Sequence, residues 1–384
     1  MAKVLAGLRV VEMGTFITGP AAAMYLGDLG ADVIKVERPG SGDPFRAFKG
    51  GLYSPHYQTY NRNKRAITLD TSKDDDRAAF HQLIETADVF IQNFRPGVAE
   101  KLGAGEAELK ALNPRLIYCA ISGFGTSGPY RDRPAYDTVA QAASGFLRLV
   151  MPPDRPRVIG PAIADAMTGF YAALGVLAAL YERQATGKGR RIDVSMLEAM
   201  CHFNLDSFTH YFSEGEIMGP LSRPSVSQSY VFACADGKWV ALHMSSPPKF
   251  WEGLAGVIEK PDLFDDPRFA TRQARIENQD ALIALMGPIF KTRTRDEWCE
   301  RLAAAEVPHS PAYDSSEALE DPQARHLQLK VSAEHPEMGT FTTVRSPLSF
   351  DGERSLDVLP PPTLGEHNDE IRAELAKRSP SAAE

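Results

Sequence analysis

The chain has 384 residues, of which 43% are hydrophobic, and a formal net charge of −8. This length exceeds what one hydrophobic core usually serves, so we expect two domains. The mild acidity, without a basic stripe interleaved with aromatic residues, argues against a nucleic-acid partner. The cysteines lack metal-ligand or redox spacing, which predicts no metal and is typical of reduced thiols in a cytoplasmic protein: Cys119, Cys201, Cys234 and Cys299.

Strands and helices alternate through the first part of the chain. Short apolar strands are predicted at 8–13, 32–37, 65–69, 89–92 and 116–121, with helices at 21–29 and 73–86. This alternation predicts an α/β fold with a doubly wound, mostly parallel, Rossmann-like sheet. Binding loops then lie at the carboxyl ends of the strands. Three of these loops carry residues capable of chemistry: Phe16–Gly19, Arg38 with its neighbours, and Asn93–Gly97.

The loop after the fifth strand contains the pattern GxGxxG at Gly123–Gly128. A dinucleotide-binding fingerprint opens a helix, but here Pro129 and Pro134 follow. No further strand supplies an acidic residue about 20 positions on. We therefore interpret the glycines as turn residues, with backbone N–H groups facing a ligand as the alternative.

The stretch Gly160–Leu180 is small or apolar throughout, except for a single charge at Asp165. Pro161 suits the first turn of a helix. Large apolar residues recur at helical spacing, which predicts one buried helix: Phe170, Leu174, Leu177 and Leu180. The run is long enough to span a membrane, but the Asp, the Pro and the many Gly and Ala favour a packed interior helix and no membrane. Asp165 either complements the positive end of the helix dipole or is a reactive carboxylate facing a pocket.

The second half of the chain changes in character. We predict a large α/β domain over 1–211 and a linker over 212–228 that contains Gly219, Pro220 and Pro224. A smaller α+β domain is expected at 229–310. Residues 311–384 contain a strand-rich segment and a charged helix, and we expect them to return and complete the large domain.

The chain resembles the family III CoA-transferases over nearly its whole length. Eight ordered blocks carry the resemblance: LGADVIKVERPGSGDPFR (29–46), NRNKRAITLD (61–70), NFRPG (93–97), LNPRLIYCAISGFGTSGP (112–129), AYDTVAQAASG (135–145), Asp165 with its helix, TGKGRRIDVSM (186–196) and LGEHN (364–368). The resemblance implies an enzyme that moves CoA from an acyl-CoA thioester to a free carboxylic acid, with coenzyme A as co-substrate. It also implies a homodimer of two interlocked subunits.

The family pattern implies specific roles for several residues. Asp165 falls at the position of the nucleophile, which forms a mixed anhydride and then an aspartyl-CoA thioester. Arg38 and Lys101 fall where the family contacts CoA phosphates, and Asn93 and Phe94 where it contacts the nucleotide or pantetheine. A solvated surface cation is the alternative for Arg38 and Lys101. Lys64 and Arg65 lie in a matching block and either bind or brace the fold.

Tyr136 stands where the related alpha-methylacyl-CoA racemases carry a histidine base, and a phenol is a poor base near neutral pH. Transferases of the family often have Tyr here, so we assign Tyr136 to the CoA site. A racemase-like isomerase and a non-catalytic CoA-binding relative remain the alternatives. Ile17 departs from the glutamine of the formyl-CoA members. The acceptor acid has candidate contacts in the smaller domain: Arg223, Gln228, His243, Ser245 and Ser246.

Overall fold

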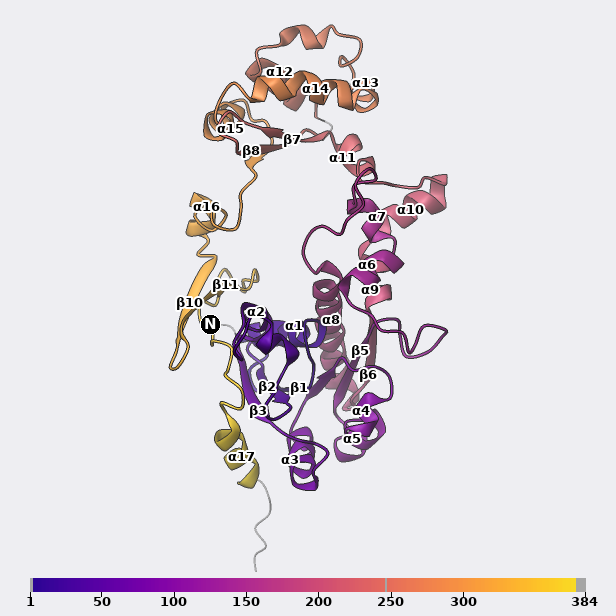
Figure 1. Ribbon diagram of the computed structural model, residues 1–384, viewed down its shortest axis with the longest axis vertical. Coiled ribbons are helices and arrows are strands. Elements are labelled where there is room, and N and C mark those ends of the chain that lie inside the picture. The colour runs from indigo at the N-terminus through magenta and orange to yellow at the C-terminus, as the bar shows by residue number, and fades with distance from the viewer. Residues whose placement is uncertain (1–2, 246, 378–384) are drawn as a thin grey trace, which may run out of the picture. The chain divides into compact units, whose positions relative to one another are not determined.

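The computed structural model describes residues 3–245 and 247–377. Two compact units make up this part of the chain (Figure 1). The first comprises residues up to 147 together with 158–205 and the segment from 328 onward. The second comprises Arg148–Arg157 and Asp206–Leu327, so it begins earlier than the 229–310 domain expected from the sequence and takes in a segment expected in the large domain.

The first unit is built on a six-stranded sheet in the order β3-β2-β1-β4-β5-β6. Every neighbouring pair is parallel, and Val10 of β1 lies level with Val33 on one side and Val89 on the other. This doubly wound order confirms the predicted fold class. The strands are β1 (Arg9–Glu12), β2 (Asp32–Glu37), β3 (Lys64–Thr68), β4 (Val89–Gln92), β5 (Ile117–Ser122) and β6 (Arg191–Ser195).

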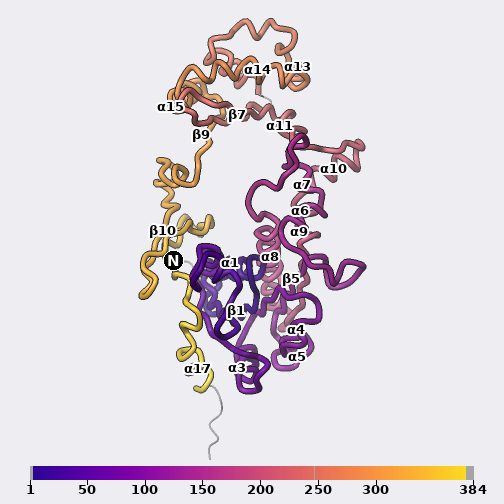
Figure 2. Tube along the Cα trace, viewed as in Figure 1, coloured from indigo at the N-terminus to yellow at the C-terminus, as the bar shows by residue number. Residues whose placement is uncertain are grey.

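Helices cover both faces of this sheet (Figures 1 and 2). One face is covered by α1 (Thr18–Asp28) and α8 (Ile163–Thr186), which pack against each other. The other face is covered by α3 (Asp74–Glu85), α5 (Glu106–Leu112) and α17 (Asn368–Ala376). Because both faces are buried, the central strands are apolar on both sides, as parallel strands usually are.

Shorter elements complete the first unit. They are η1 (Pro44–Ala47), α2 (Pro55–Asn61), α4 (Val98–Lys101), α6 (Asp137–Ala143), α9 (Met196–Phe203) and the antiparallel pair β10 (Lys330–His335) and β11 (Gly339–Val344). The helix α7 (Phe146–Val150) spans the change from one unit to the other. No described residue of the Gly123–Gly128 loop is helical, and Gly125 and Gly128 have φ of +96° and +84°, which fits the turn interpretation.

The second unit is an α+β structure around an antiparallel sheet in the order β7-β8-β9. Its strands are β7 (Ser229–Ala233), β8 (Trp239–His243) and β9 (His309–Pro311). Its helices are α10 (Leu205–Glu214), α11 (Ser222–Ser227), α12 (Pro248–Val257), η2 (Pro261–Phe264), α13 (Arg272–Glu277), α14 (Gln279–Phe290), α15 (Arg295–Ala304) and α16 (Pro322–His326). The core centres on the stacked rings of Phe232 and Phe290, whose centroids lie 4.5 Å apart. The predicted linker at 212–228 therefore contains a helix, α11.

The predicted helix at 160–180 is α8, and Leu180 is buried as predicted, but two of the other predicted positions are not. Phe170 and Leu174 are 51% and 52% exposed in the described chain, so the expectation that they are buried is wrong. Small residues face the core instead, because α8 lies very close to α1: a Cβ on Gly169 would come within 2.9 Å of Ala21 and of the Thr18 carbonyl. Among the described helices, α8 is the one long and apolar enough to cross a membrane, with 44% of that window buried.

Candidate active site

The two loops that follow β1 and β4 diverge at the carboxyl edge of the sheet. Strand order reverses between these two strands, and ligands of doubly wound folds bind in the crevice at this point. A cavity of about 310 Å³ lies there, lined by Thr15 and Phe16 of the first loop and Asn93 and Phe94 of the second. The carboxyl group of Asp165 is part of the same wall. The sequence-predicted residues Asn93, Phe94, Tyr136 and Asp165 thus come together around one cavity.

Asn93 joins the two loops through its side-chain amide. Its Oδ1 accepts a hydrogen bond from Thr15 N at 2.9 Å, and its Nδ2 donates to Thr15 O at 2.8 Å and to Thr18 Oγ1 at 2.9 Å. Phe16, between these contacts, has φ of +62° in the left-handed region, and Asp43 Oδ1 accepts from its N–H at 3.1 Å. A strained residue persists only where its surroundings hold it, so Asn93 and Asp43 fix the shape of this wall.

A buried cluster of charged side chains supports these loops. Lys35 Nζ lies 3.2 Å from Glu12 Oε1 and 3.1 Å from Asp43 Oδ2, and it donates to Gly14 O at 3.0 Å. Lys64 Nζ lies 3.2 Å from Glu12 Oε2. All four ionic side chains are fully buried. Burial disfavours the Lys35 cation, but Glu12 and Asp43 raise the pKa of Lys35, whereas burial lowers the pKa of Lys64 to about 8.

This arrangement answers the question that the sequence left open about two basic residues. Lys64 also donates to Pro20 O and Asn61 Oδ1, both at 2.9 Å, so it braces the fold. Arg65 pairs with Asp32 at 2.7 Å and with Glu374 of α17 at 2.6 Å. Both cations therefore form their ion pairs with residues of the first unit.

Asp165 lies in the first turn of α8 and is partly buried. The backbone N–H groups of Ala164 and Asp165 donate to Asp137 Oδ1, and no described residue donates a hydrogen bond to the Asp165 carboxylate. Burial, and after it the negative charge of Asp137, raise the pKa of Asp165 to about 7. The sequence left two interpretations of Asp165, a partner of the helix N-terminus or a carboxylate facing a pocket. Asp137 caps the helix, and Asp165 lines the cavity, which favours the second interpretation.

Three arginines line the same cavity and were not singled out from the sequence as its residues: Arg95, Arg131 and Arg133. All three are exposed, and two of them come from the loop after β5, at the same sheet edge as the other two loops. The sequence signal that could have identified these arginines is their position in loops that follow predicted parallel strands. Tyr136 is 62% exposed, and its ring meets Phe16 edge-on with centroids 6.0 Å apart.

A second cavity, of about 540 Å³, lies against the loops that follow β2 and β3. Arg38, Asp70 and Phe94 are among its lining residues. Arg38 is exposed, and its guanidinium has no hydrogen bond or ion pair to a described residue. Phe94 lines both cavities, so one aromatic ring borders each. Lys101 is exposed at the end of α4 and lines neither cavity, although its neighbour Leu102 lines the second.

Comparison with known proteins identifies the family of this chain and agrees with its fold. The sequence profile of CoA-transferase family III matches residues 5–368. The chain belongs to this family. It is 34% identical, over 96% of its length and 93% of the relative, to a succinyl-CoA–D-citramalate CoA-transferase of Chloroflexus aurantiacus. It is 35% identical, over 97% and 95%, to a formyl-CoA:oxalate CoA-transferase of Streptomyces avermitilis.

A solved structure supports the same conclusion for the fold. The crystal structure of a CaiB/BaiF family protein from Brucella suis has a TM-score of 0.87 and 35% sequence identity to this chain. The match covers 97% of this chain and 99% of that protein. The resemblance stated from the eight sequence blocks is therefore confirmed.

The candidate acceptor contacts of this family member lie in the second unit. Gln228 is buried and fully engaged, because its Nε2 donates to Ser245 O at 2.6 Å and its Oε1 accepts from Arg275 Nε at 2.8 Å. His243 Nδ1 lies 3.0 Å from Ser229 Oγ, and Arg223 is exposed on α11. Ser246 lies outside the described residues. Gln228 thus has a role in the fold that the sequence did not indicate.

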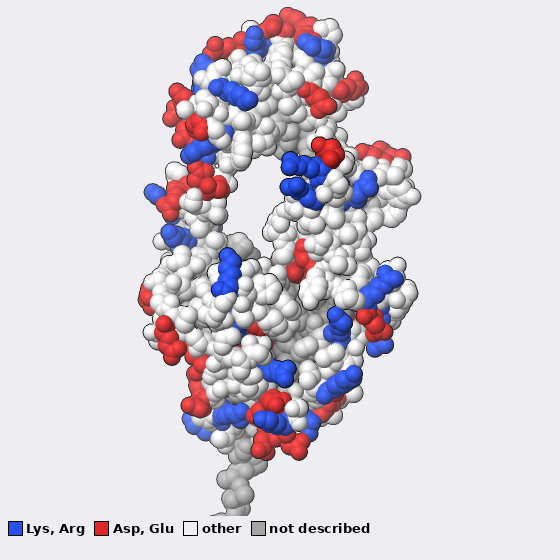
Figure 3. Space-filling view, in the orientation of Figure 1, with Lys and Arg blue, Asp and Glu red and all other residues white. Residues whose placement is uncertain are grey.

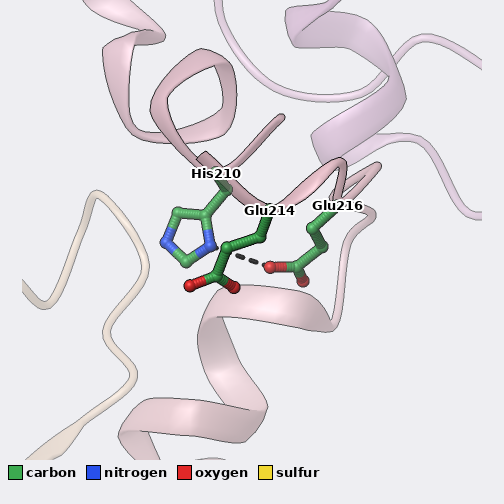
Figure 4. A group of neighbouring side chains, drawn as sticks. All are labelled: His210, Glu214 and Glu216. Carbon is green, nitrogen blue, oxygen red and sulfur yellow. Dashed lines mark hydrogen bonds and ion pairs between the residues drawn. The ribbon is translucent and has the colours of Figure 1, made fainter. Parts of the chain in front are cut away.

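Figure 4 shows the one group of described side chains that could hold a metal ion: His210, Glu214 and Glu216. The ring Nδ1 of His210 lies 2.8 Å from Glu216 Oε2, so these two side chains form a hydrogen-bonded pair. Both glutamates are exposed, and the group belongs to the second unit, whereas Asp165 belongs to the first. On the face drawn in Figure 3, basic and acidic side chains are intermixed over much of the surface.

Proposed function

We propose that this CoA-transferase moves CoA from an acyl-CoA thioester to a free carboxylic acid through a covalent intermediate on Asp165. The observation that carries the proposal is a partly buried carboxylate to which no described residue donates a hydrogen bond, on the wall of the cavity at the switch point of the sheet. A carboxylate that is poorly solvated and more basic than usual is a better nucleophile.

The reaction proceeds in four balanced steps. A carboxylate oxygen of Asp165 attacks the thioester carbonyl, the C–S bond breaks, and a mixed anhydride and CoA thiolate form. The thiolate attacks the Asp165 carbonyl and releases the donor acid as its carboxylate, which leaves an aspartyl-CoA thioester. The acceptor carboxylate attacks this thioester and releases the thiolate again, forming a second anhydride. The thiolate then attacks the acceptor carbonyl, giving the new acyl-CoA and free Asp165.

We assign the substrate CoA to the two cavities that share Phe94. Its thioester end faces Asp165, and its nucleotide lies against Arg38, whose free guanidinium suits a phosphate. Asn93, Phe94 and Tyr136 would line the path between these ends, and Lys101 would contribute a charge at the rim. The arginines Arg95, Arg131 and Arg133 place further positive charge beside a polyanionic substrate.

The acids themselves are proposed as a class. The relatives' names join succinyl-CoA with D-citramalate, formyl-CoA with oxalate and, for a human relative 30% identical, succinyl-CoA with glutarate. Most of these acids carry two carboxyl groups. We therefore propose short dicarboxylic acids as the first acceptors to test.

We also propose that the protein works as a homodimer of interlocked subunits in the cytoplasm, without a membrane. The exposed apolar side chains of α8 support a protein partner: Phe170 is 51% exposed, Leu174 52% and Tyr181 79%. They lie on one helix at helical spacing, and a folded single chain leaves them in water.

The decisive experiment is a matrix of acyl-CoA donors against carboxylic acids, with mass detection of every new CoA thioester. We expect Asp165→Asn to fold normally and to lose several orders of magnitude in kcat, as for a lost covalent nucleophile. Hydroxylamine should inactivate the wild type only when acyl-CoA is present, because it attacks the Asp165 carbonyl of the aspartyl-CoA thioester, releases CoA and leaves an inactive hydroxamate on the side chain. An Asn variant that keeps most of the transferase rate would refute the proposal.

The racemase alternative makes a different prediction. Proton exchange α to a thioester needs a base on one face of the carbon and its conjugate acid on the other. Tyr136 stands where the second base would be, so we expect acyl transfer without exchange. Incubation with a 2-methylacyl-CoA in deuterium oxide tests this. Deuterium entering the α-position at catalytic rates, with no transfer to any acid, would establish the racemase instead.

A further inference from the structure

Asp137 reaches the first turn of α8 from a different helix, α6. Its Oδ1 accepts hydrogen bonds from Ala164 N at 2.8 Å and from Asp165 N at 3.2 Å. Gln141 Nε2 donates to its Oδ2 at 2.5 Å. A capping side chain normally comes from the residue that begins the helix, but Ala162 at this position provides none. The cap of α8 is therefore supplied from 27 residues earlier in the chain.

The other donors of this turn are also engaged. Ile163 N donates to Pro161 O at 2.8 Å, and Ala166 N donates to Ala162 O at 3.2 Å. Since Ala164 and Asp165 donate to Asp137, no backbone N–H of the first turn remains for the Asp165 carboxylate. Such groups, with the helix dipole, normally stabilise an acidic side chain at a helix start. In α8, Asp137 receives this stabilisation in place of Asp165.

The charge of Asp137 also acts on Asp165, second to burial. Burial and then Asp137 raise the pKa of Asp165. Other ionisable groups lie around it: Tyr60 of α2, and Arg95, Arg131, Arg133 and Tyr136 on the cavity wall. On the neighbouring helices, the ionisable groups are engaged elsewhere: Glu198 of α9 with Ser195, His202 of α9 with Tyr171, and Asp28 of α1 with Arg62.

We propose that Asp137 is a positioning residue for the transfer reaction, because it occupies the N-terminus of α8 and leaves the Asp165 carboxylate in place but unstabilised. The inference rests on the proposed function of Asp165 as the nucleophile. A less stabilised carboxylate is more basic and attacks a thioester carbonyl faster once it is ionised. An uncharged cap would hold the helix equally well but would leave Asp165 a weaker nucleophile.

The variant Asp137→Asn tests charge separately from capping. Its amide oxygen can still accept from both backbone N–H groups, and Gln141 can turn its Oε1, which has no hydrogen-bond partner, toward the new amide nitrogen. We expect the ionisation midpoint of Asp165 to fall by about one pH unit. Carboxyl-13C-aspartate NMR measures this midpoint, with the signal assigned by its loss in Asp165→Asn. The acidic limb of kcat/KM should move equally, and kcat at pH 8.5 should fall about threefold, because the rate of nucleophilic attack follows only part of a change in the nucleophile's pKa.

A matched control is available in the second unit. Asp321, the N-cap residue of α16, likewise accepts from two backbone N–H groups, Gln323 N at 2.8 Å and Ala324 N at 3.4 Å, and from the Tyr313 hydroxyl at 3.0 Å. Asp321→Asn should leave the Asp165 titration and the pH profile unchanged. If Asp137→Asn fails to fold, Asp137→Ser keeps a capping oxygen without charge.

The outcomes separate this inference from the proposed function. If a folded Asp137 variant lowers only thermal stability and moves neither the NMR midpoint nor the pH profile, Asp137 is a structural cap and the positioning role is wrong. If Asp165→Asn keeps its transferase rate, the proposed function fails whatever the NMR titration of Asp137→Asn shows. A shift in both measurements, with an inactive Asp165→Asn, supports both.

Discussion

The function proposed for Asp165 requires its ionised form, but its position in the fold disfavours ionisation. Its pKa is raised from 3.8 to about 7, first by burial and then by Asp137. A carboxyl group whose pKa is raised in the folded state lowers stability as pH rises from its unfolded value to its folded one. Well below pH 4 the group is protonated in both states and contributes nothing, and at pH 4 its contribution is still small. The active form is thus also the less stable form.

We expect Asp165→Asn to be more stable than the wild type at pH 8, by roughly 2 to 4 kcal/mol, and nearly equally stable at pH 4. Urea unfolding at the two pH values measures this difference. The wild-type kcat/KM should rise with pH through an apparent pKa near 7, because only the carboxylate attacks. A stabilisation at pH 4 as large as that at pH 8 would contradict the ionic explanation.

Arg38 is expected to act through binding rather than through chemistry. It lines the second cavity with a free guanidinium, whereas Asp165 lines the first. Arg38→Ala should therefore raise KM for the CoA donor about tenfold with little change in kcat, because a remote phosphate contact is similar in ground and transition states. Steady-state kinetics over a range of donor concentrations separates the two constants. A lowered kcat at unchanged KM would remove Arg38 from the CoA site.

At the scale of the element, the loop after β1 depends on the buried cluster beneath it. Lys35→Met keeps the volume of the side chain but leaves Glu12 and Asp43 without their shared partner. Removing one member of a buried ion pair costs about 3 to 5 kcal/mol, so we expect a loss of this size in urea unfolding. Lys73→Met is the matched control, because Lys73 is 73% exposed and lies 3.9 Å from Asp70. Equal effects of the two substitutions would show that the cluster does not support the fold.

Elements that are determined by their local sequence could be predicted. Features that depend on contacts with residues far away in the chain could not. The strands β2 and β4 have the predicted bounds because each is a short segment rich in Val, Ile or Phe. The exposed face of α8 was misjudged because Gly169 sets how closely α1 approaches, and this contact joins residues far apart in the chain.

The same reason applies to the site. Asp165, Asn93 and Phe94 were found from short motifs, and the structure places them on one cavity. The cap from Asp137 joins two helices whose pairing no local pattern encodes. Likewise, the burial of Gln228 depends on Arg275, which lies 47 residues away. Local sequence therefore indicated which side chains line the cavity, but not which side chains from other elements contact them.

At the scale of the whole molecule, the exposed face of α8 is expected to be covered by a second copy. Leu174→Glu places a charge among these apolar side chains and should convert the dimer to monomer or weaken it at least tenfold. Gln184→Glu, on an exposed position near the end of the same helix, is the control. Sedimentation velocity at micromolar concentration measures both. A monomeric wild type would contradict the dimer, and subunit exchange within seconds without unfolding would contradict interlocking.

The position of α17 has a consequence for how the protein is made. Ile371 and Leu375 are buried in the same cluster as Phe80 and Leu83, and Asn368 Oδ1 accepts from Thr68 N at the edge of β3. A ribosome that has finished all six strands of the sheet has therefore not yet produced the helix that covers part of one face. Until this helix has been translated, that apolar surface is open to chaperones or to aggregation. A premature stop shortly before residue 364 would make this temporary exposure permanent, so such a product should be degraded or insoluble although it contains Asp165.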